Sequence, residues 1–384
     1  MGIRLSSSEY KNFEDEASLT ADTALPDEGS VNDLVESKRL NALVLPSNLS
    51  IVRKRAIIAV MGSIVADAAA QPLHYIADSD SIHKILEQNN AVDPEFLPVS
   101  ANPRYKIDTG QQSCYGDQLM VFMDSLANHG GIIDVKDLIR RIVRYFGPNS
   151  EYEPKDPTER PLPCPLRTSA ISDIISNSLR YGLDGQNLGP TDDYNADCLC
   201  KLAPVVGMFA GQRNMLASVE KVARITQNNT KSLAICLAAA RILEHYLLKG
   251  YDKDVFTIVQ NELKNPQRTL PTDEDRNVAD MIQSIVDMKS RSHVNVVSHV
   301  GHSSAIAEVF QCSLHVLLTA KSYIDGVRNT LIAGGCNCSR ATFIGACLAA
   351  QFGIDAIPMQ WIRKTNSSSY AFELAKKLMK IQTN

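Results

Sequence analysis

The heptapeptide GGCNCSR at residues 334–340 places two thiols, those of Cys336 and Cys338, where a helix is expected to begin. Backbone N–H groups at a helix N-terminus stabilise a thiolate, so the pKa of both thiols is expected to be lowered. The pattern fits a soft-metal site, a redox or nucleophilic thiol, or a packed turn. The Cys-x-Cys spacing recurs at Cys198 and Cys200, but zinc sites favour Cys-x-x-Cys spacing. Pocket-lining cysteines without chemistry are therefore the favoured interpretation, ahead of a reactive thiol and a four-cysteine metal site.

Two other segments carry acids that could act beside these thiols. GSIVADAAAQPLH at residues 62–74 predicts a buried helix rich in small residues, in which Asp67 and His74 flank a break at Pro72. Asp117 falls in the first turn of another predicted helix, where a carboxylate complements the helix dipole. Capping or packing would explain each acid alone. However, the N-termini of two helices in one bundle can face each other across a pocket. The N-terminus that carries Asp117 and the one that carries the two thiols together suggest such a pocket.

Histidines near residue 300 form a second group of candidate ligands. The favoured interpretation is a solvated turn before the helix SSAIAEVF, with Ser303 or Ser304 as its cap. The overlapping segment VNVVSHV, residues 294–300, is the best candidate for a β-strand in the chain. We therefore assign no ligand role to the histidines of this region, which are His293, His299 and His302.

The elements that must position these residues are almost all helical. Apolar residues recur at helical spacing through most of the chain after residue 51, and alternating β-type stretches are nearly absent. Residues 147–166 carry six prolines and predict a long surface loop, a kind of segment that is often functional. Residues 1–50 are polar and acidic and predict a disordered tail. The sequence therefore predicts an all-α fold with one compact helical domain at 51–384.

Composition limits the classes of function. The chain has 384 residues, 44% of them hydrophobic, and a formal net charge of −4, so it lacks the basic surplus that nucleic-acid binding requires. No secretory signal or uninterrupted apolar run of membrane-spanning length is evident, and nine cysteines, an odd number, fit reduced thiols. We therefore expect a cytoplasmic protein with no membrane span and no nucleic-acid partner. Gly2 and Ser6 also fit the permissive N-myristoylation pattern.

Several motifs occur together in a fixed order. GSIVADAAAQPLH is followed by CYGDQLMVFMDSL at residues 114–126, KLAP at 201–204, Thr-Gln at 226–227, and GGCNCSRATFIGACLAAQFG with IPMQWI near the end. Over about residues 55–365 this order and spacing resemble the ADP-ribosylglycohydrolase family. The residues within the motifs resemble its branch of J-type lens crystallins and selenoprotein J. The resemblance implies a compact multi-helix bundle.

The resemblance also implies a mechanism. Family enzymes hold two magnesium ions with a Thr-Asp-Asp and an Asp-x-Asp-Thr motif, and these ions bind the distal ribose and orient the water that releases ADP-ribose. Magnesium needs oxygen ligands in near-octahedral geometry. The matching residues here are Tyr115, Gly116 and Asp117 in the first motif and Cys336, Cys338 and Ser339 in the second. Asp117 is the only matched carboxylate that remains, and Ser339 stands at a threonine position. A two-magnesium site is therefore not expected, and the sequence identifies no other cofactor.

The same matching gives a set of residues expected to line a pocket for an ADP-ribose-like small molecule. Four of them depart from the family pattern, with histidine in place of glutamate, tyrosine in place of threonine, lysine in place of arginine and glutamine in place of histidine. The pocket residues are Asp67, His74, Tyr115, Lys201 and Gln227.

Three functions follow from these residues. The favoured one is a pseudoenzyme with a structural or ligand-binding role. The second is a hydrolase of ADP-ribosyl or related glycosidic bonds with an altered metal site, which uses Asp117 as its catalytic residue, alone or with Asp67 and a single metal. The third is thiol redox chemistry at Cys336 and Cys338.

Overall fold

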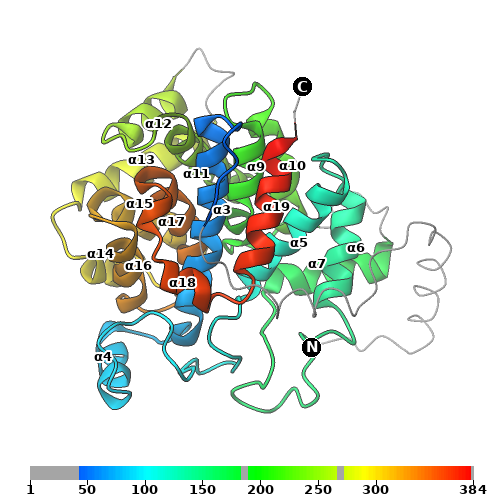
Figure 1. Ribbon diagram of the computed structural model, residues 1–384, viewed down its shortest axis with the longest axis vertical. Helices are drawn as coiled ribbons and strands as arrows, with labels where there is room; N and C mark the ends of the chain where they lie inside the picture. The colour runs from blue at the N-terminus through cyan, green and yellow to red at the C-terminus, as the bar shows by residue number, and fades with distance from the viewer. Residues whose placement is uncertain (1–42, 183–188, 266–271, 382–384) are drawn as a thin grey trace.

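The computed structural model describes residues 43–182, 189–265 and 272–381 (Figure 1). Over these ranges the chain forms seventeen α-helices, two short 3-10 helices and no strand beyond two isolated bridges. The all-α prediction is confirmed. Residues 1–42 of the expected tail, with Gly2, lie outside the described residues. Residues 43–50 are described and pack against the core through Leu43, Leu45 and Leu49.

Nine of these helices begin at a side-chain cap, where a Ser, Thr, Asp or Asn oxygen accepts a backbone N–H of the first turn. In chain order the bounds are α3 Ile51–Ala70, η1 Gln71–Leu73, α4 Ser79–Gln88, α5 Cys114–Asn128, α6 Val135–Phe146, α7 Ser169–Tyr181, α8 Asp197–Cys200, α9 Leu202–Phe209, α10 Met215–Thr226, α11 Thr230–Lys249, α12 Val255–Lys264, α13 Asp273–Asp287, α14 His293–Val300, α15 Ile306–Thr319, α16 Tyr323–Ile332, α17 Asn337–Phe352, η2 Ile354–Ala356, α18 Met359–Lys364 and α19 Ser368–Lys380.

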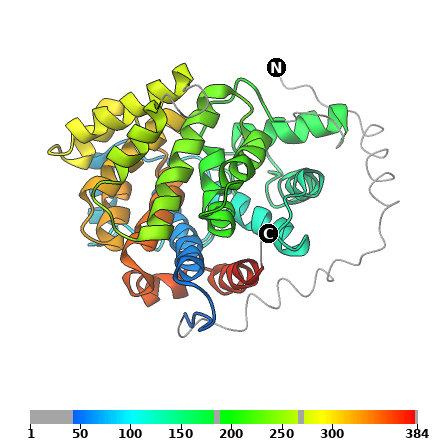
Figure 2. The same cartoon turned by 90° about the horizontal axis from the view of Figure 1, so that it is seen from above.

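Helix α3 lies at the centre of the molecule, with α11 and α17 on one side and α9 and α19 on the other (Figures 1 and 2). Its small residues let a neighbouring backbone approach closely. A Cβ atom added at Gly62 would lie 2.3 Å from the carbonyl oxygen of Gly345 on α17, and the reverse distance is also 2.3 Å. The contact between α3 and α17 therefore depends on glycine at both positions. The same contact brings Asp67, near the end of α3, beside Cys338 in the first turn of α17.

Helix α3 has the length and apolar composition of a membrane span. The segment Ile51–Leu73 meets both criteria, and its most apolar window is completely buried in the fold. Ser63 and Asp67 interrupt the apolar run, and both side chains are buried. The core helix of a globular protein meets the same criteria, and the burial of α3 within this bundle gives it that role.

The strand expected at residues 294–300 is wrong, because this segment lies in helix α14. Ser292 caps the helix by accepting the backbone N–H of Asn295 at 3.3 Å, and Val296 and Val297 face the core. A short apolar run cannot be assigned to helix or strand by periodicity alone. The cap in front of it was the signal that favoured a helix.

The histidine turn was also partly wrong. His299 and His302 are exposed, as expected of a solvated turn. His293 is instead buried in α14, with its Nδ1 3.2 Å from Nδ1 of His315 on α15. Neither Ser303 nor Ser304 is the N-cap of α15, because the helix begins one residue later, after Ala305, without a side-chain cap.

The proline-rich segment 147–166 forms no helix, as predicted, and connects α6 to α7 along the lower edge of Figure 1. Two large side chains of this loop are buried, those of Tyr152 and Leu162, and Tyr152 belongs to the main core. The ring of Tyr152 is 3% exposed and packs edge-on against Phe146, with ring centroids 4.7 Å apart. The loop is therefore anchored at Tyr152, close to the start of α5.

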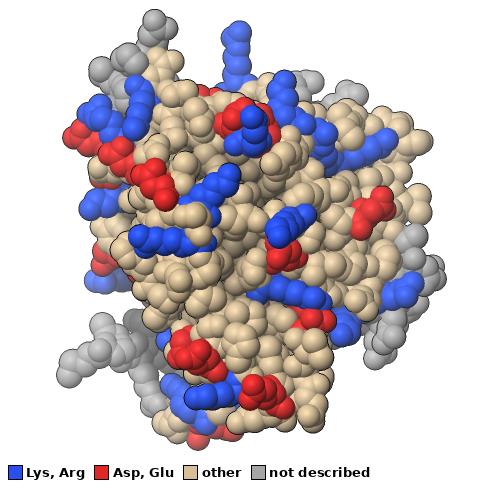
Figure 3. Space-filling view, turned by 90° about the vertical axis from the view of Figure 1, so that its left-hand side faces the viewer, with Lys and Arg blue, Asp and Glu red and all other residues tan. Residues whose placement is uncertain are grey.

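Surface charge shows no large field of one sign on the face in Figure 3, which is the left-hand side of Figure 1. Lys and Arg side chains alternate there with Asp and Glu side chains. This mixture agrees with the small formal net charge of −4. A nucleic-acid surface would need a continuous basic stripe, which this face lacks.

Candidate functional site

Asp67 fixes the start of α5. Its carboxylate accepts hydrogen bonds from the backbone N–H of Ser113 at 2.7 Å and from the Ser113 hydroxyl at 2.6 Å. Ser113 is the N-cap of α5, so the acid on α3 holds the opening of the next helix in the site. Asp67 is fully buried, and this burial raises its pKa to about 7 although the Ser113 hydrogen bonds oppose the rise. The carboxyl therefore titrates near neutral pH.

Asp117 lies in the first turn of α5, as predicted, and is half-buried. The hydroxyl of Tyr152 donates to its Oδ2 at 2.6 Å. Burial raises the pKa of Asp117 to about 7, and nearby Asp67 adds to the rise, while the hydrogen bond from Tyr152 opposes it. Sequence reasoning did not single out Tyr152. The one signal for it was its place in a long proline-rich loop, a kind of segment that often contributes to a site.

Cys336 is the N-cap of α17 and is held by residues from two other segments. Its Sγ lies 3.2 Å from Nε2 of His74, which follows η1, and 3.6 Å from the hydroxyl of Tyr115 on α5. All three side chains are buried. The structure therefore brings together three of the residues expected from the sequence, and they form a packed cluster.

Cys338 points elsewhere, because its Sγ contacts the carbonyl oxygen of Asp67 at 3.9 Å. The expectation of a lowered pKa is wrong for both thiols. Burial raises the pKa of Cys336 and raises that of Cys338 well above its usual value. Desolvation of a thiolate outweighs the dipoles at the helix N-terminus here. Ser339 uses its hydroxyl locally and donates to the carbonyl oxygen of Cys336 at 2.7 Å.

Cys198 and Cys200 form no metal site with the other two thiols. Cys200 donates to the carbonyl oxygen of Asp197 at 2.9 Å, within its own short helix. Across the three described ranges, no group of three or more His, Cys, Asp or Glu side chains could hold a metal ion. All nine cysteines are free thiols, and eight of them are buried.

Lys201 is buried in a polar network that ties α8 to α5 and α7. Its ammonium group donates to the carbonyl oxygen of Asp197 at 2.6 Å and to Oε1 of Gln118 at 3.1 Å. The Asp197 carboxylate accepts from Gln118 at 2.7 Å and from Thr168 at 2.5 Å. Burial raises the pKa of Asp197, and the charge of Lys201 opposes this rise. The sequence suggested Lys201 but none of its partners.

We expect Lys201→Met to lower the free energy of unfolding by about 2–3 kcal/mol, since methionine leaves Gln118 without its donor and Asp197 without its cation. Urea unfolding at neutral pH measures this loss. Lys221→Met is the matched control, because Lys221 is exposed and, within the described part of the chain, donates to the carbonyl oxygen of Ile133 alone, at 2.7 Å. Equal losses in the two variants would contradict a structural role for the buried lysine.

Gln227 belongs to a different polar cluster. It is the C-cap of α10, and its side-chain amide donates to Oδ1 of Asp193 at 3.2 Å. Asp193 also accepts from the hydroxyl of Ser169 at 2.5 Å and from the backbone of Asn195 at 2.8 Å. The side-chain hydrogen bond of Gln227 thus joins it to the loop before α8 and not to Asp117 or the thiols.

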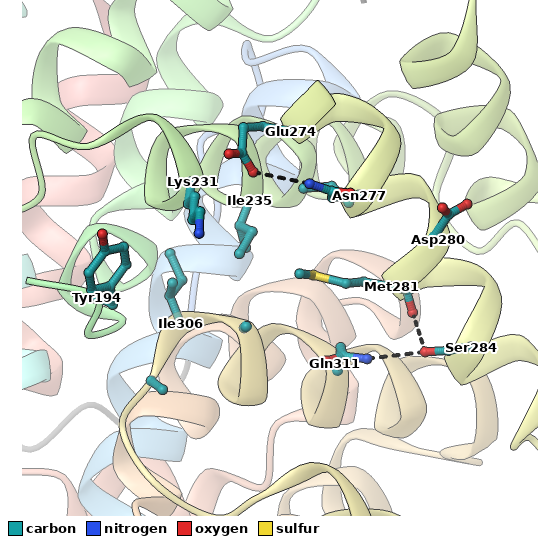
Figure 4. A pocket seen from close by; sticks show the side chains of 13 residues that line it. Tyr194, Lys231, Ile235, Glu274, Asn277, Asp280, Met281, Ser284, Ile306 and Gln311 are labelled. Carbon is teal, nitrogen blue, oxygen red and sulfur yellow. Dashed lines mark hydrogen bonds between the residues drawn. The ribbon is translucent and has the colours of Figure 1, made fainter. Parts of the chain in front are cut away.

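A surface pocket of about 480 Å³ lies apart from the expected site (Figure 4). It is bounded by α11, α13 and the start of α15, with Ile235, Met281 and Ile306 toward its interior and Lys231 and Glu274 at its edge. None of the pocket residues expected from the sequence lines it. The expected residues instead make the packed contacts described above.

Comparison with known proteins places the chain in a family. The sequence model of the ADP-ribosylglycohydrolase family matches residues 48–384, so the chain belongs to this family. Two relatives from Tripedalia cystophora, Crystallin J1B and Crystallin J1A, are each 32% identical to it. The alignments cover 86% of this chain and 98% and 97% of the relatives. A solved structure titled ADP-ribosylglycohydrolase-related protein complex shares the fold, with a TM-score of 0.58 and 16% identity over 86% of this chain and 99% of that one.

Proposed function

We propose that this chain is a pseudoenzyme of the ADP-ribosylglycohydrolase family with a structural or ligand-binding role. The observation that carries the proposal is the chemistry at the positions where the family resemblance puts magnesium ligands. Gly116, Cys336 and Cys338 offer no side-chain oxygen there. Asp117 and Ser339 are the oxygen-bearing remnants, and each is already hydrogen-bonded to a neighbour.

The residues present do not fit two magnesium ions. Magnesium takes about six oxygen ligands at short distance, and thiols are soft ligands that suit other metals. The space is also filled, since the Tyr115 hydroxyl reaches Sγ of Cys336 at 3.6 Å. A Cβ atom at Gly116 would lie 2.2 Å from Oε1 of Gln112 and 2.4 Å from Oδ2 of Asp67. Restoring an aspartate at position 116 would thus require its neighbours to move.

The relatives support the structural half of the proposal. Both are named crystallins, and they align with 86% of this chain at 32% identity. For the ligand-binding half, we propose an ADP-ribose-like small molecule as the partner, on the family resemblance of the motifs. A cytoplasmic location and the absence of a nucleic-acid partner remain predictions.

A second candidate is a hydrolase of ADP-ribosyl or related glycosidic bonds with an altered site. The observation in its favour is the pair of neighbouring acids, because burial raises the pKa of both Asp67 and Asp117 to about 7. Carboxyl groups that titrate near neutral pH can exchange protons with a reacting bond. Asp117 is the better placed of the two for contact with a ligand, since it is half-buried whereas Asp67 is enclosed.

Calorimetric titration and a hydrolysis assay test the two candidates. We expect no saturable magnesium binding, and we expect ADP-ribose to bind equally with and without magnesium. We also expect no hydrolysis of an ADP-ribosylated peptide above the Asp117→Ala background. Asp124→Ala is the matched control on α5, where Asp124 accepts a hydrogen bond from Tyr370. Magnesium-dependent binding or turnover that is lost in Asp117→Ala and kept in Asp124→Ala would overturn the pseudoenzyme proposal in favour of the hydrolase.

A further inference from the structure

The thiol of Cys336 lies against an imidazole whose second nitrogen is also held. Sγ of Cys336 is 3.2 Å from Nε2 of His74, and Nδ1 of His74 is 3.1 Å from the hydroxyl of Tyr105. When Nδ1 carries the ring proton and the Tyr105 oxygen accepts it, Nε2 has a lone pair for the thiol proton. A thiol, a base and a group that orients the base are the parts that activate a cysteine nucleophile.

This cluster lies directly beneath the surface, under two stacked side chains. The ring of Tyr75 covers the ring of His74, with centroids 3.7 Å apart and planes inclined by 14°. The guanidinium of Arg104 lies over the outer face of Tyr75, 4.2 Å from its centroid. Arg104 is exposed and Tyr75 is half-buried, whereas His74 and Cys336 are each 2% exposed. Movement of Tyr75 and Arg104 would therefore uncover the imidazole and then the thiol.

Tyr75 is held in place at a cost in backbone energy. Its φ is 69°, in the left-handed region that residues other than glycine rarely adopt. Its backbone N–H donates to the carbonyl oxygen of Gly335 at 2.9 Å, one residue before Cys336. Strain of this kind clusters at functional sites and can be released when the segment moves. We take Tyr75 to be the lid of the thiol site.

The backbone around Cys336 selects among the reactions of a thiol. Acyl transfer needs free N–H groups to stabilise an oxyanion. Here the N–H of Gly335 donates to Ile76, that of Cys336 to His302 and that of Asn337 to Gly335, while the Ser339 N–H is directed at the Cys336 thiol and favours its thiolate form. Thiol–disulfide exchange develops no oxyanion and needs only a thiolate and an accessible disulfide sulfur.

A buried cation lies close to the same thiol. Arg340 is fully buried, its guanidinium donates to the carbonyl oxygen of Gly334, its Nε has no hydrogen-bond partner, and no carboxylate in the described ranges forms an ion pair with it. Its charge favours the thiolate form of Cys336. Burial of a guanidinium is costly, and although the charge of Glu308 also acts on Arg340, negative charge developing on the sulfur of Cys336 would offset more of that cost.

From this geometry we propose that Cys336 is a nucleophilic thiol, gated by Tyr75, which forms a mixed disulfide with a low-molecular-weight disulfide. Burial lowers the pKa of His74 and raises that of Cys336, so the step follows the movement of Tyr75 that lets water reach both groups. The thiol proton then passes to Nε2 of His74, and the sulfur electron pair forms a bond to one sulfur of the reagent. The S–S bond of the reagent breaks, and its pair leaves on the second sulfur, which takes the proton back from His74. Cys336 is oxidised to the mixed disulfide while half of the reagent is reduced to a thiol. This activity is independent of magnesium and of whether the family hydrolysis is lost.

The test follows the reaction of the folded, full-length chain with dithiodipyridine, a neutral aromatic disulfide that releases a coloured thione. Cys164→Ser is the background, since Cys164 is the one cysteine that is not buried. We expect one mixed disulfide per chain, located by mass spectrometry on the tryptic peptide 329–340. Cys336→Ser should abolish it. Cys338→Ser is the matched control and should keep it, because Cys338 lies in the same peptide and contacts a carbonyl oxygen in place of an imidazole.

Two further variants test the base and the lid. His74→Phe keeps a ring beneath Tyr75 and removes the proton acceptor, so the reaction should slow by at least about tenfold. Tyr75→Gly suits the positive φ and uncovers the imidazole, so the reaction should accelerate. The proposal is overturned if Cys336 reacts no faster than the buried Cys347, or if His74→Phe reacts as fast as the background. Should His74→Phe fail to fold, a Tyr75→Gly chain that reacts no faster than the background overturns the proposal by itself.

Discussion

Alanine in place of Gly345 is expected to lower the free energy of unfolding by more than about 3 kcal/mol. The added Cβ would lie 2.3 Å from the carbonyl oxygen of Gly62 and 2.7 Å from Cβ of Ala66. A backbone oxygen cannot rotate away as the end of a flexible side chain can. Helices α3 and α17 would therefore have to separate at the centre of the fold. Urea unfolding followed by circular dichroism measures the loss.

Ser63→Ala is the matched control for this substitution. Ser63 neighbours Gly62 on α3 and is 1% exposed, and its hydroxyl has no hydrogen-bond partner. Replacing it removes a buried unpaired polar atom without adding volume, so the stability should stay the same or rise. A loss below about 1 kcal/mol for Gly345→Ala would contradict the close-approach argument, because overpacking of a rigid contact costs more than that.

The small residues of α3 and α17 explain why much of the fold was predictable from sequence. Both segments combine helical periodicity with glycine and alanine. Such a pattern predicts both a helix and a close approach to a neighbouring helix, and both features are readable from the sequence alone. Segment 294–300 was mispredicted because β-branched residues outweighed the cap at Ser292. The proline-rich loop was predicted, since proline excludes a regular element whatever surrounds it.

The site was less predictable, because its residues were found but not their partners. His74, Tyr115 and Cys336 were expected near one pocket, and they do meet. Tyr152 was missed, because a tyrosine in a loop carries no sign of which acid its hydroxyl will reach. Gln227 was expected at the same pocket, yet its hydrogen bond goes to Asp193. Matching to a family transfers positions along the chain, whereas hydrogen-bond partners depend on side chains that differ from the family.

The pKa of the two thiols was mispredicted for a related reason. A helix opening is visible in the sequence, and it does favour a thiolate. The burial of that helix N-terminus cannot be read from the sequence, because it depends on residues from α3, α5 and η1 that cover it. Burial raises the pKa of Cys336 and Cys338 in spite of the helix. Gated access, as proposed for Cys336, is one way for such a thiol to remain reactive.

The second large effect is expected from the pH dependence of stability at Asp67. Folding raises the pKa of this carboxyl from 3.8 to about 7, chiefly by burial. Holding the ionised form inside the fold therefore costs roughly 4 kcal/mol. We expect Asp67→Asn to gain stability relative to the parent chain by roughly 3 kcal/mol between about pH 5 and pH 8. Urea unfolding of both chains across this range measures the difference.

The sign follows from counting protons. Between about pH 4 and pH 7 the folded chain keeps the proton on Asp67 while the unfolded chain has lost it. The folded state then binds more protons, so stability falls as pH rises through this window and becomes constant above the folded pKa. Asparagine carries no titrating group, so the variant lacks this contribution. It can still accept the Ser113 backbone N–H and donate from its amide to the Ser113 hydroxyl, which keeps the start of α5 in place.

Asp117→Asn distinguishes this effect from a general response of the site to pH. Burial also raises the pKa of Asp117 to about 7, but Asp117 as a residue is half-buried whereas Asp67 is fully enclosed, so water can screen it more. Its variant should change the pH dependence in the same direction and by less. Equal changes in the two variants would mean that Asp117 is as well shielded from water as Asp67, and Asp117 would then be no more available to a ligand than Asp67. A larger change at Asp67 would instead identify this acid as a structural group that connects two helices, which leaves Asp117 as the acid available to a ligand.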